Sequence, residues 1–247
     1  MKGMAIQGIG LVGGFGCGLE DFAAALAAGS VPARPESFAG GELPALLADT
    51  APLERFVDKR PLRRIDHFSR LALLGAHLAL EDAALPALDR ARLGLIVATG
   101  YGATATTFAF LDTVLDGGDA LASPTHFSSS VHNAAAAHTA ILLGITGPNL
   151  TVSQFEMSVP SALLAAQGWL AEGRVDAVLF GGVDEACAVL RYCWERVFPE
   201  MSTDIRPFDF AAQSAVPGEG AAFFLLTVTG PARYGRITAV RQGNCAG

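Results

Sequence analysis

Charged residues are scarce in this sequence. Only 17% of its 247 residues are Asp, Glu, Lys or Arg, and 51% are hydrophobic, whereas soluble domains carry about 25% charged residues. The shortage favours a surface that is buried against a partner, although an Ala- and Gly-rich background would give the same statistic. The net charge of −7 argues against a nucleic-acid-binding protein, because such proteins neutralise phosphates with Lys and Arg.

Cysteine and long apolar runs are also lacking. The four cysteines, at positions 17, 187, 193 and 245, show no CxxC spacing, which argues against a disulfide framework and a zinc site. We expect no metal and no cofactor, and we expect Cys187 and Cys193 to be small core hydrophobes. No apolar run reaches the roughly 20 residues of a membrane helix, and the N-terminus lacks a signal-peptide layout. These absences predict a cytoplasmic chain with no membrane partner.

Alternating strand and helix patterns predict an α/β fold. Apolar runs typical of sheets covered on both faces predict strands at 4–10, 93–99, 149–155, 175–180 and 221–227. Apolar residues at helical spacing predict helices at 19–28, 69–84, 104–116, 132–143 and 158–172. Residues 30–62 contain five prolines and little periodicity, so we expect an excursion from the sheet there. The length suits one domain over residues 1–247.

Residues 149–161 predict a buried strand, a sharp turn and the start of a helix. Such an elbow holds a side chain exposed at a helix N-terminus, where the helix dipole favours an anion. A second strand and the pair Gly181-Gly182 follow. Together these features resemble the nucleophile elbow of the β-ketoacyl synthases of the thiolase fold. Aligning the elbow and the glycine pair without a gap places Glu156 on the family's catalytic cysteine.

Other motifs follow in the order of that family. They lie at 4–10, 65–74, 93–102, 131–136, 147–148, 181–185, 206–209 and 218–222. The resemblance implies a thiolase-like layered fold with a mixed sheet and helices on both faces, of which this chain supplies the first, N-terminal half only. Residues 234–240 resemble the strand that opens the second half.

The departures from the family concern its chemistry. A carboxylate at position 156 cannot accept and pass on an acyl group as a thiolate does. The family carries two catalytic histidines in its C-terminal half, and none of the histidines at 67, 77, 126, 132 and 138 lies in a matching motif. The resemblance therefore implies a chain that is not a condensing enzyme by itself.

Two functions remain open. The resemblance implies a non-catalytic chain-length factor, which pairs with an active β-ketoacyl synthase in a fatty-acid or polyketide system and meets an acyl carrier protein transiently. Within the family, the short length resembles the factors of aryl-polyene systems. Heterodimers of the family join across the strand before the elbow, formed here by Leu150, Thr151, Val152, Ser153, Gln154 and Phe155. The alternative is a malonyl-thioester decarboxylase that uses a Glu-substituted elbow, and it requires His126 or His132 to point at Glu156.

The resemblance also places the floor of an acyl tunnel near residues 104–110. Phe108 and Phe110 are the large side chains there. Two residues along a helix subtend about 200°, so both rings cannot face the same way. We favour Phe108, because Thr104, Thr107 and Leu111 are expected to share its side.

A basic window precedes the predicted long helix. It contains Arg55, Lys59, Arg60, Arg63, Arg64 and Arg70. Charge runs are commonly solvated faces or pairing surfaces for nearby acids. The alternative is a docking patch for the phosphopantetheine-bearing carrier or the catalytic partner, with Arg60, Arg63 and Arg64 as candidates.

Three smaller features have competing interpretations. Gly8, Gly10 and Gly13 form a GxGxxG without the helix and ribose-binding acid of a dinucleotide site, which favours a tight structural turn. His132 and Asn133 are predicted to cap or brace the helix behind the elbow. Glu156 is interpreted as a charge held by backbone N–H groups, half of a salt bridge to a partner, or a structural plug, in preference to an acid–base group.

Overall fold

The computed structural model describes residues 3–29, 31, 33–38, 41–85, 88–197 and 216–243. The family-like motif at 206–209, together with Pro32 and Cys245, lies outside the described residues. In the described part, no helix is long and apolar enough to cross a membrane.

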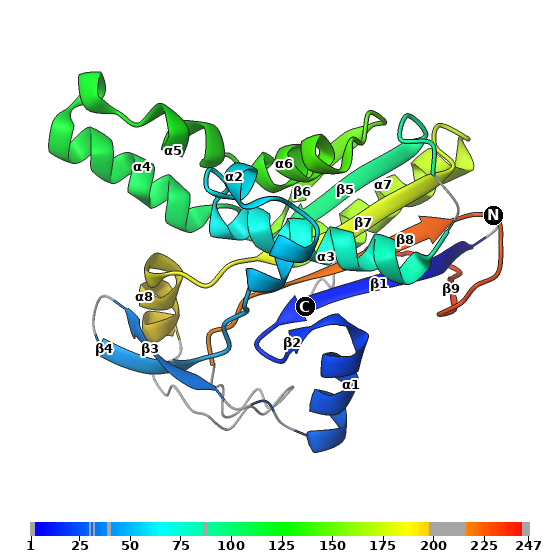
Figure 1. Cartoon of the computed structure of the whole chain (residues 1–247), viewed down its shortest axis with the longest axis horizontal. Helices are drawn as coiled ribbons and strands as arrows, with labels where there is room; N and C mark the ends of the chain where they lie inside the picture. Colours follow the sequence, from blue (N-terminus) through cyan, green and yellow to red (C-terminus); the bar gives the residue numbers. More distant parts are fainter. Residues whose placement is uncertain are drawn as a thin grey trace.

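A mixed seven-stranded sheet forms the centre of the molecule (Figure 1). Its strands are β1 (Met4–Gly13), β2 (Gly16–Cys17), β5 (Leu93–Thr99), β6 (Asn149–Ser153), β7 (Ala177–Asp184), β8 (Gly220–Thr227) and β9 (Arg236–Ile237). The order is β2-β1-β8-β7-β5-β6, with β9 paired to β1. β5 runs parallel to β6 and β7, whereas β8 is antiparallel to β7 and β1. β6 therefore lies at one edge of the sheet.

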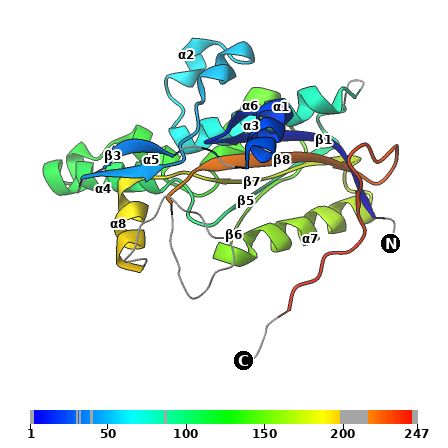
Figure 2. The same ribbon diagram turned by 90° about the horizontal axis from the view of Figure 1, so that it is seen from below.

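Helices cover both faces of this sheet (Figure 2). α3 (His67–Ala83) and α6 (Ala134–Leu143) lie on one face, and α7 (Ser158–Ala171) lies on the other. α1 (Gly18–Ala28) contacts β1 and β2. α4 (Thr104–Gly117), the 3-10 turn η2 (Asp119–Leu121) and α5 (Pro124–Ser129) form an arm that extends from the sheet, and α8 (Ala188–Val197) contacts α4. The predicted fold class is confirmed.

The alternation of side chains along the central strands creates two cores. Leu95 and Leu179 face α3 and α6, whereas Ile96, Val178 and Phe180 face α7. All seven residues of β5 are buried, which explains why this strand appears in the sequence as an uninterrupted apolar run.

The GxGxxG glycines allow close packing. A Cβ at Gly8 would collide with the carbonyl oxygen of Ala79, and one at Gly10 with that of Gly75, so both glycines let β1 approach α3. Gly13 alone borders a turn, because it pairs with Gly16 across the β1–β2 hairpin. The tight-turn interpretation is therefore correct for Gly13 and wrong for the other two.

The described part of the 30–62 excursion forms small elements outside the main sheet. β3 (Arg34–Phe38) and β4 (Gly41–Ala45) pair as an antiparallel hairpin, followed by the 3-10 helix η1 (Ala51–Arg55) and the single-turn α2 (Lys59–Leu62). The division into one domain with an excursion remains a prediction.

The ten predicted strands and helices are all present, with differences at their ends. The predicted strand 149–155 ends at Ser153, because Phe155 has φ = 48° and turns the chain. Within 234–240, Arg236 and Ile237 pair with Ala5 and Met4 of β1. In the described residues this segment therefore extends the first sheet and does not open a second one.

Candidate functional site

The elbow joins the edge strand to α7. After β6, the 3-10 turn η3 (Phe155–Met157) leads directly into α7 at Ser158. The Ser158 hydroxyl accepts a hydrogen bond from the Gln154 N–H at 2.8 Å and lies 2.9 Å from the Thr99 carbonyl oxygen at the end of β5. Phe155 stands in the left-handed region at φ = 48°, which costs roughly 1–3 kcal/mol for a residue other than glycine. The predicted strand, elbow and helix start are present, but β6 is half-buried with exposed ends, so the prediction that this strand is buried is wrong within the described chain.

Glu156 lies exposed on the elbow. Within the described chain its carboxylate makes no hydrogen bond and no ion pair, so the interpretation as a charge held by backbone N–H groups is wrong for this chain alone. The plug interpretation is also wrong within it, because the side chain fills no interior space. A salt bridge to a partner remains a hypothesis.

The two histidines required by the decarboxylase alternative contact other groups. The His132 ring lies against Gly102, where it would meet an added Cβ. His126 Nδ1 is buried without a hydrogen-bond partner in the described part of the chain. No hydrogen bond connects either ring to Glu156 among the residues described. The geometry gives that alternative no support.

The predicted capping role of His132 and Asn133 is wrong in part. Asn133 precedes α6, but its side chain makes no capping hydrogen bond. Asn149 supplies the brace instead, because its Nδ2 donates to the Ala136 carbonyl oxygen at 3.1 Å and ties β6 to α6.

An aromatic cluster stands beside the elbow. The Tyr101 ring lies edge-on to Phe155 at 6.0 Å and to Trp194 at 6.4 Å between centroids. The three rings come from the loop after β5, from the elbow and from α8. Phe155 is 66% exposed, so its strained backbone presents a large apolar ring to the surface.

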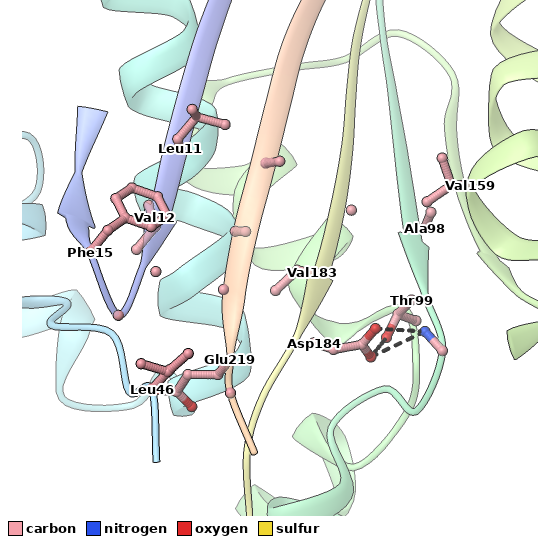
Figure 3. A pocket seen from close by; sticks show the side chains of 18 of the residues that line it. Leu11, Val12, Phe15, Leu46, Ala98, Thr99, Val159, Val183, Asp184 and Glu219 are labelled. Atoms are coloured by element: carbon pink, nitrogen blue, oxygen red, sulfur yellow. Dashed lines mark hydrogen bonds between the residues drawn. The ribbon is translucent and has the colours of Figure 1, made fainter. Parts of the chain in front are cut away.

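Asp184 ties together the carboxyl ends of β5 and β7 (Figure 3). Its carboxylate accepts hydrogen bonds from the Thr99 hydroxyl at 2.7 Å, the Gly100 N–H at 3.0 Å and the Tyr101 N–H at 3.0 Å. These bonds hold the loop that leads into α4. The sequence analysis assigned Asp184 no role beyond its family-like motif, although an acid at the end of a strand opposite a Gly-x-Gly loop is a usable signal.

A cavity of about 680 Å³ opens between the elbow and the β1–β2 turn. It lies on the α7 face of the sheet, and Figure 3 shows Leu11 on one side of it and Ala98 and Val159 on the other. Apolar side chains from six segments of the chain contribute to its walls: Leu11, Phe15, Phe22, Val31, Leu46, Ala98, Phe155 and Val159. The sequence analysis did not predict this cavity.

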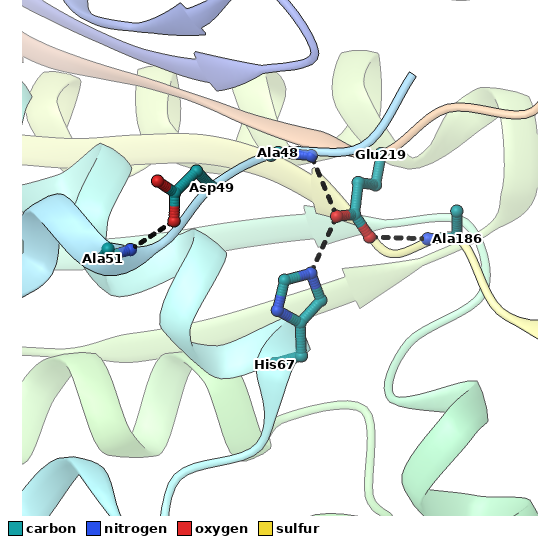
Figure 4. A network of polar contacts seen from close by, with 6 residues as sticks. All are labelled: Ala48, Asp49, Ala51, His67, Ala186 and Glu219. Atoms are coloured by element: carbon teal, nitrogen blue, oxygen red, sulfur yellow. Dashed lines mark hydrogen bonds and ion pairs between the residues drawn. The ribbon is translucent and has the colours of Figure 1, made fainter. Parts of the chain in front are cut away.

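A buried polar network lies at the same end of the sheet (Figure 4). Glu219 Oε1 accepts a hydrogen bond from the Ala48 N–H at 3.0 Å and lies 2.8 Å from His67 Nε2, while Oε2 accepts from the Ala186 N–H at 3.1 Å. The hydrogen bond to Glu219 raises the pKa of His67, although burial acts in the opposite direction. Glu219 thus connects α3, the loop before η1 and the loop after β7.

Glu185 is the other buried acid of this region and is only 3% exposed. Its Oε1 accepts a hydrogen bond from the Ala105 N–H at 2.9 Å, in the first turn of α4. Burial raises the pKa of Glu185 to about 7, and the Ala105 hydrogen bond only partly opposes it. The N-terminus of α4 is therefore held by an acid that titrates near neutral pH.

The structure separates the two predicted tunnel residues. Phe110 packs against Phe127 of α5 with centroids 5.4 Å apart. Phe108 is 43% exposed and shares a helical stripe with the exposed Leu111 and Leu115. Thr107 belongs with Phe110, because its hydroxyl lies 2.9 Å from the Ser130 carbonyl oxygen at the end of α5. Grouping Thr107 with Phe108 is therefore wrong, and the tunnel role of both rings remains a prediction.

The basic window divides into paired and unpaired residues. Arg55 pairs with Glu81 and Lys59 with Glu54, each at 3.0 Å, and Arg70 donates to the carbonyl oxygens of residues 62 and 65. Three other arginines have exposed side chains and make no ion pair within the described chain: Arg60, Arg63 and Arg64. Their docking role remains a prediction.

The cysteines and potential metal ligands are dispersed. Cys187 is buried as predicted, but Cys193 is exposed on α8, so its assignment to the core is wrong. Across the part of the chain that the structure covers, no group of three or more His, Cys, Asp or Glu residues could hold a metal ion.

Comparisons with known proteins agree with this geometry. Residues 4–230 match the family model "Beta-ketoacyl synthase, N-terminal domain". The "Putative polyketide beta-ketoacyl synthase 1" of Streptomyces virginiae is 30% identical over 241 residues, which are 90% of this chain and 57% of that protein. The chain spans about half the length of the curated relatives it matches.

Solved structures show the same fold. A β-ketoacyl synthase from Burkholderia phymatum STM815 superposes with a TM-score of 0.76 at 23% identity, covering 92% of this chain and 59% of that one. A chain from the structure of the ketosynthase ApeO in complex with its chain length factor ApeC, from Xenorhabdus doucetiae, superposes with a TM-score of 0.74 at 20% identity, covering 93% of this chain and 59% of that one.

Proposed function

The chain belongs to the β-ketoacyl synthase family, and we propose that it is a non-catalytic, chain-length-factor-like subunit. In this proposal it pairs with an active β-ketoacyl synthase and shapes that enzyme's acyl tunnel in fatty-acid or polyketide biosynthesis, including systems of the aryl-polyene type. One solved structure that contains this fold is a complex of a ketosynthase with its chain length factor, which supports an assembly of this kind.

Glu156 carries the proposal. It occupies the elbow between β6 and α7, the position that the resemblance assigns to the catalytic cysteine. A carboxylate at that point is a poor nucleophile toward a thioester and cannot store an acyl group as a thiolate does. The fold of the site is thus retained while its acyl-transfer chemistry is lost.

The open edge of β6 supports the proposed partner interface. In the described structure β6 pairs with β5 alone, so its other side leaves backbone N–H and C=O groups available. Unpaired edges invite pairing with another chain. We propose that residues 150–155 meet the catalytic subunit, with the strained, exposed Phe155 at the end of that interface.

Two further surfaces fit the same assembly. The stripe formed by Phe108, Leu111 and Leu115 is exposed, and Leu115 reaches 81% exposure, so a partner is needed to bury it. We propose that Phe108 faces the partner's acyl tunnel. The unpaired guanidinium groups of Arg60, Arg63 and Arg64 are suited to the acidic surface or phosphate of an acyl carrier protein.

Co-expression with a catalytic β-ketoacyl synthase tests the proposal. The expected result is a stable complex on size-exclusion chromatography, whose product lengths differ from those of the synthase alone when acyl- and malonyl-carrier substrates are supplied. Glu156→Gln, which keeps the side-chain shape, should leave turnover unchanged. Failure to form a complex, or identical products with and without this chain, would refute it.

A further inference from the structure

We propose that the Glu185 carboxyl holds the arm of α4, η2 and α5 against the rest of the chain while it is protonated, and that the base of the arm opens when it ionises. Glu185 is thus a positioning residue for α4. The opening follows from the structure of this chain, whereas its consequence for product length rests on the proposed function, in which α4 carries Phe108.

The arm has little packing that holds it in place. None of residues 104–128 is buried, and the arm extends away from the sheet (Figure 1). Within the arm α4 packs against η2 and α5, and outside it α4 packs against α8. Segments with few buried side chains open locally at a lower free-energy cost than the core does. The arm is therefore suited to move without unfolding the sheet.

The two ends of the arm meet at its base. The Thr107 hydroxyl lies 2.9 Å from the Ser130 carbonyl oxygen, and the His132 ring lies against Gly102. These contacts join the segment that enters the arm to the segment that leaves it, so both ends move together. Gly102 has φ = 65°, and glycine tolerates the changes in backbone angle that a hinge requires.

Glu185 ties this base to the end of β7. Its Oε1 accepts a hydrogen bond from the Ala105 N–H at 2.9 Å. Among the described residues, no other hydrogen bond joins the arm to an element outside it and its two flanking loops. The neighbouring Asp184 accepts from the Gly100 and Tyr101 N–H groups. The loop is therefore fixed as far as Tyr101, and the arm can turn beyond that point.

The surroundings of Glu185 favour its neutral form. The described titratable groups that act on it, or on which it acts, come from the start of α3, the start of β8 and the loop before α8: Asp66, His67, Glu219 and Cys187. On α8, Arg191 is paired with Glu195. Burial, with smaller contributions from Asp66 and Glu219, raises the pKa of Glu185 to about 7, against the Ala105 hydrogen bond and His67.

The direction of the pH effect follows from where Glu185 meets water. In the closed arm its pKa is about 7, whereas a solvated Glu keeps its ordinary value of 4.5. The closed arm binds the proton more tightly, so the ratio of open to closed arms rises between about pH 4.5 and pH 7 and then levels off. Deprotonation of His67 removes a positive charge that acts on Glu185 and has the same direction. From the two pKa values of Glu185 we expect an increase of about tenfold between pH 6 and pH 8.

Hydrogen–deuterium exchange of the full chain, read by mass spectrometry at pH 6 and pH 8, measures this opening. Rates are divided by the intrinsic rate at each pH, and a peptide from β5 is the internal reference. Protection of residues 104–107 should fall about tenfold in the wild type and less than twofold in Glu185→Gln, which stays neutral and keeps an acceptor. Glu172→Gln, exposed and outside the arm, is the matched control and should behave as the wild type does.

The neutral variant decides whether the carboxyl is responsible. If Glu185→Gln does not fold, as judged by circular dichroism, Glu185→Met takes its place, because Met is unbranched, neutral and adapts to the same space. Wild-type protection that does not change with pH would overturn the inference. The same pH dependence in the wild type and the neutral variant would also overturn it, because another group would then control the arm.

The link to product length has its own measurement. In the reconstituted complex with a catalytic β-ketoacyl synthase, the wild-type chain should give a broader distribution of carrier-bound product lengths at pH 8 than at pH 6, and Glu185→Gln should give the same distribution at both. Distributions that respond to pH equally with both chains would overturn this link. Because the exchange measurement uses no partner, its failure is distinguishable from a failure of the chain-length role.

Discussion

Replacing Glu185 with Gln should stabilise the chain above neutral pH and have little effect in acid. Glu185 is 3% exposed, and burial raises its pKa from 4.5 to about 7. Between these two values the folded state keeps a proton that the unfolded state has released, so stability decreases as the pH rises from about 4.5 to about 7. Gln stays neutral throughout and can still accept the hydrogen bond from the Ala105 N–H.

The size of the effect follows from the width of that window. The shift is 7 − 4.5 = 2.5 pKa units, and each unit corresponds to about 1.36 kcal/mol. At pH 8, Glu185→Gln should therefore raise the free energy of unfolding by about 3 kcal/mol, whereas at pH 4 the two proteins should differ little.

Other titrating groups affect both proteins and largely cancel in the difference. The raised pKa of His67 contributes stability that is present below its unfolded pKa and lost as the pH rises through its folded pKa. His77 acts in the opposite direction, because burial, with a smaller contribution from Arg90, lowers its pKa to about 4. Its effect increases stability as the pH rises from about 4 to 6.5.

Urea unfolding at pH 5, 6, 7 and 8 measures the effect, with m-values compared to confirm that the same transition is observed. Glu172→Gln, at the exposed end of α7, is the matched control for the Glu-to-Gln exchange itself. A Glu185→Gln difference that stays constant with pH, or a variant less stable than wild type at pH 8, would show that Glu185 is held as a needed charge.

Three further predictions test the proposed assembly. The isolated chain should show no condensation with acyl- and malonyl-carrier substrates, and turnover that Glu156→Ala abolishes would overturn the non-catalytic assignment. Val152→Pro should weaken the complex on size-exclusion chromatography, because proline removes an N–H from the edge strand; unchanged affinity would place the interface elsewhere. In the complex, Phe108→Ala should lengthen carrier-bound products by about two to four methylenes, from the volume that a lost ring leaves. Phe110→Ala should lower stability without changing product length, since its ring packs on Phe127, and mass spectrometry showing no shift for either variant would mean that the partner alone measures the chain.

The central strands could be predicted because burial on both faces leaves a signal in every residue. Every residue of β5 is buried and all but Thr99 are apolar, so its existence and its ends agree with the prediction. The predicted end of β6 was wrong because the turn depends on the positive φ of Phe155. No sequence pattern indicates a left-handed backbone at an apolar residue. The missed elements range from β2, with two residues, to α8, with ten. Only the shortest of them provide too few positions for a periodic pattern.

The cavity and the network of buried acids could not be predicted from the sequence, for a different reason. The floor of the cavity forms because Ala98, Gly182, Ala222 and Leu11 are in register, although they are far apart in the sequence and each is unremarkable in its own strand. From the sequence, Glu185 is expected to be an exposed charge that follows a strand. Its burial depends on the first turn of α4, which packs over it. Local patterns determine which segments become strands, whereas strand register determines which side chains meet. The functional hypotheses that depend on single motifs, such as Glu156 on the elbow, could therefore be stated from the sequence, whereas the cavity, which combines residues of several strands, required the fold.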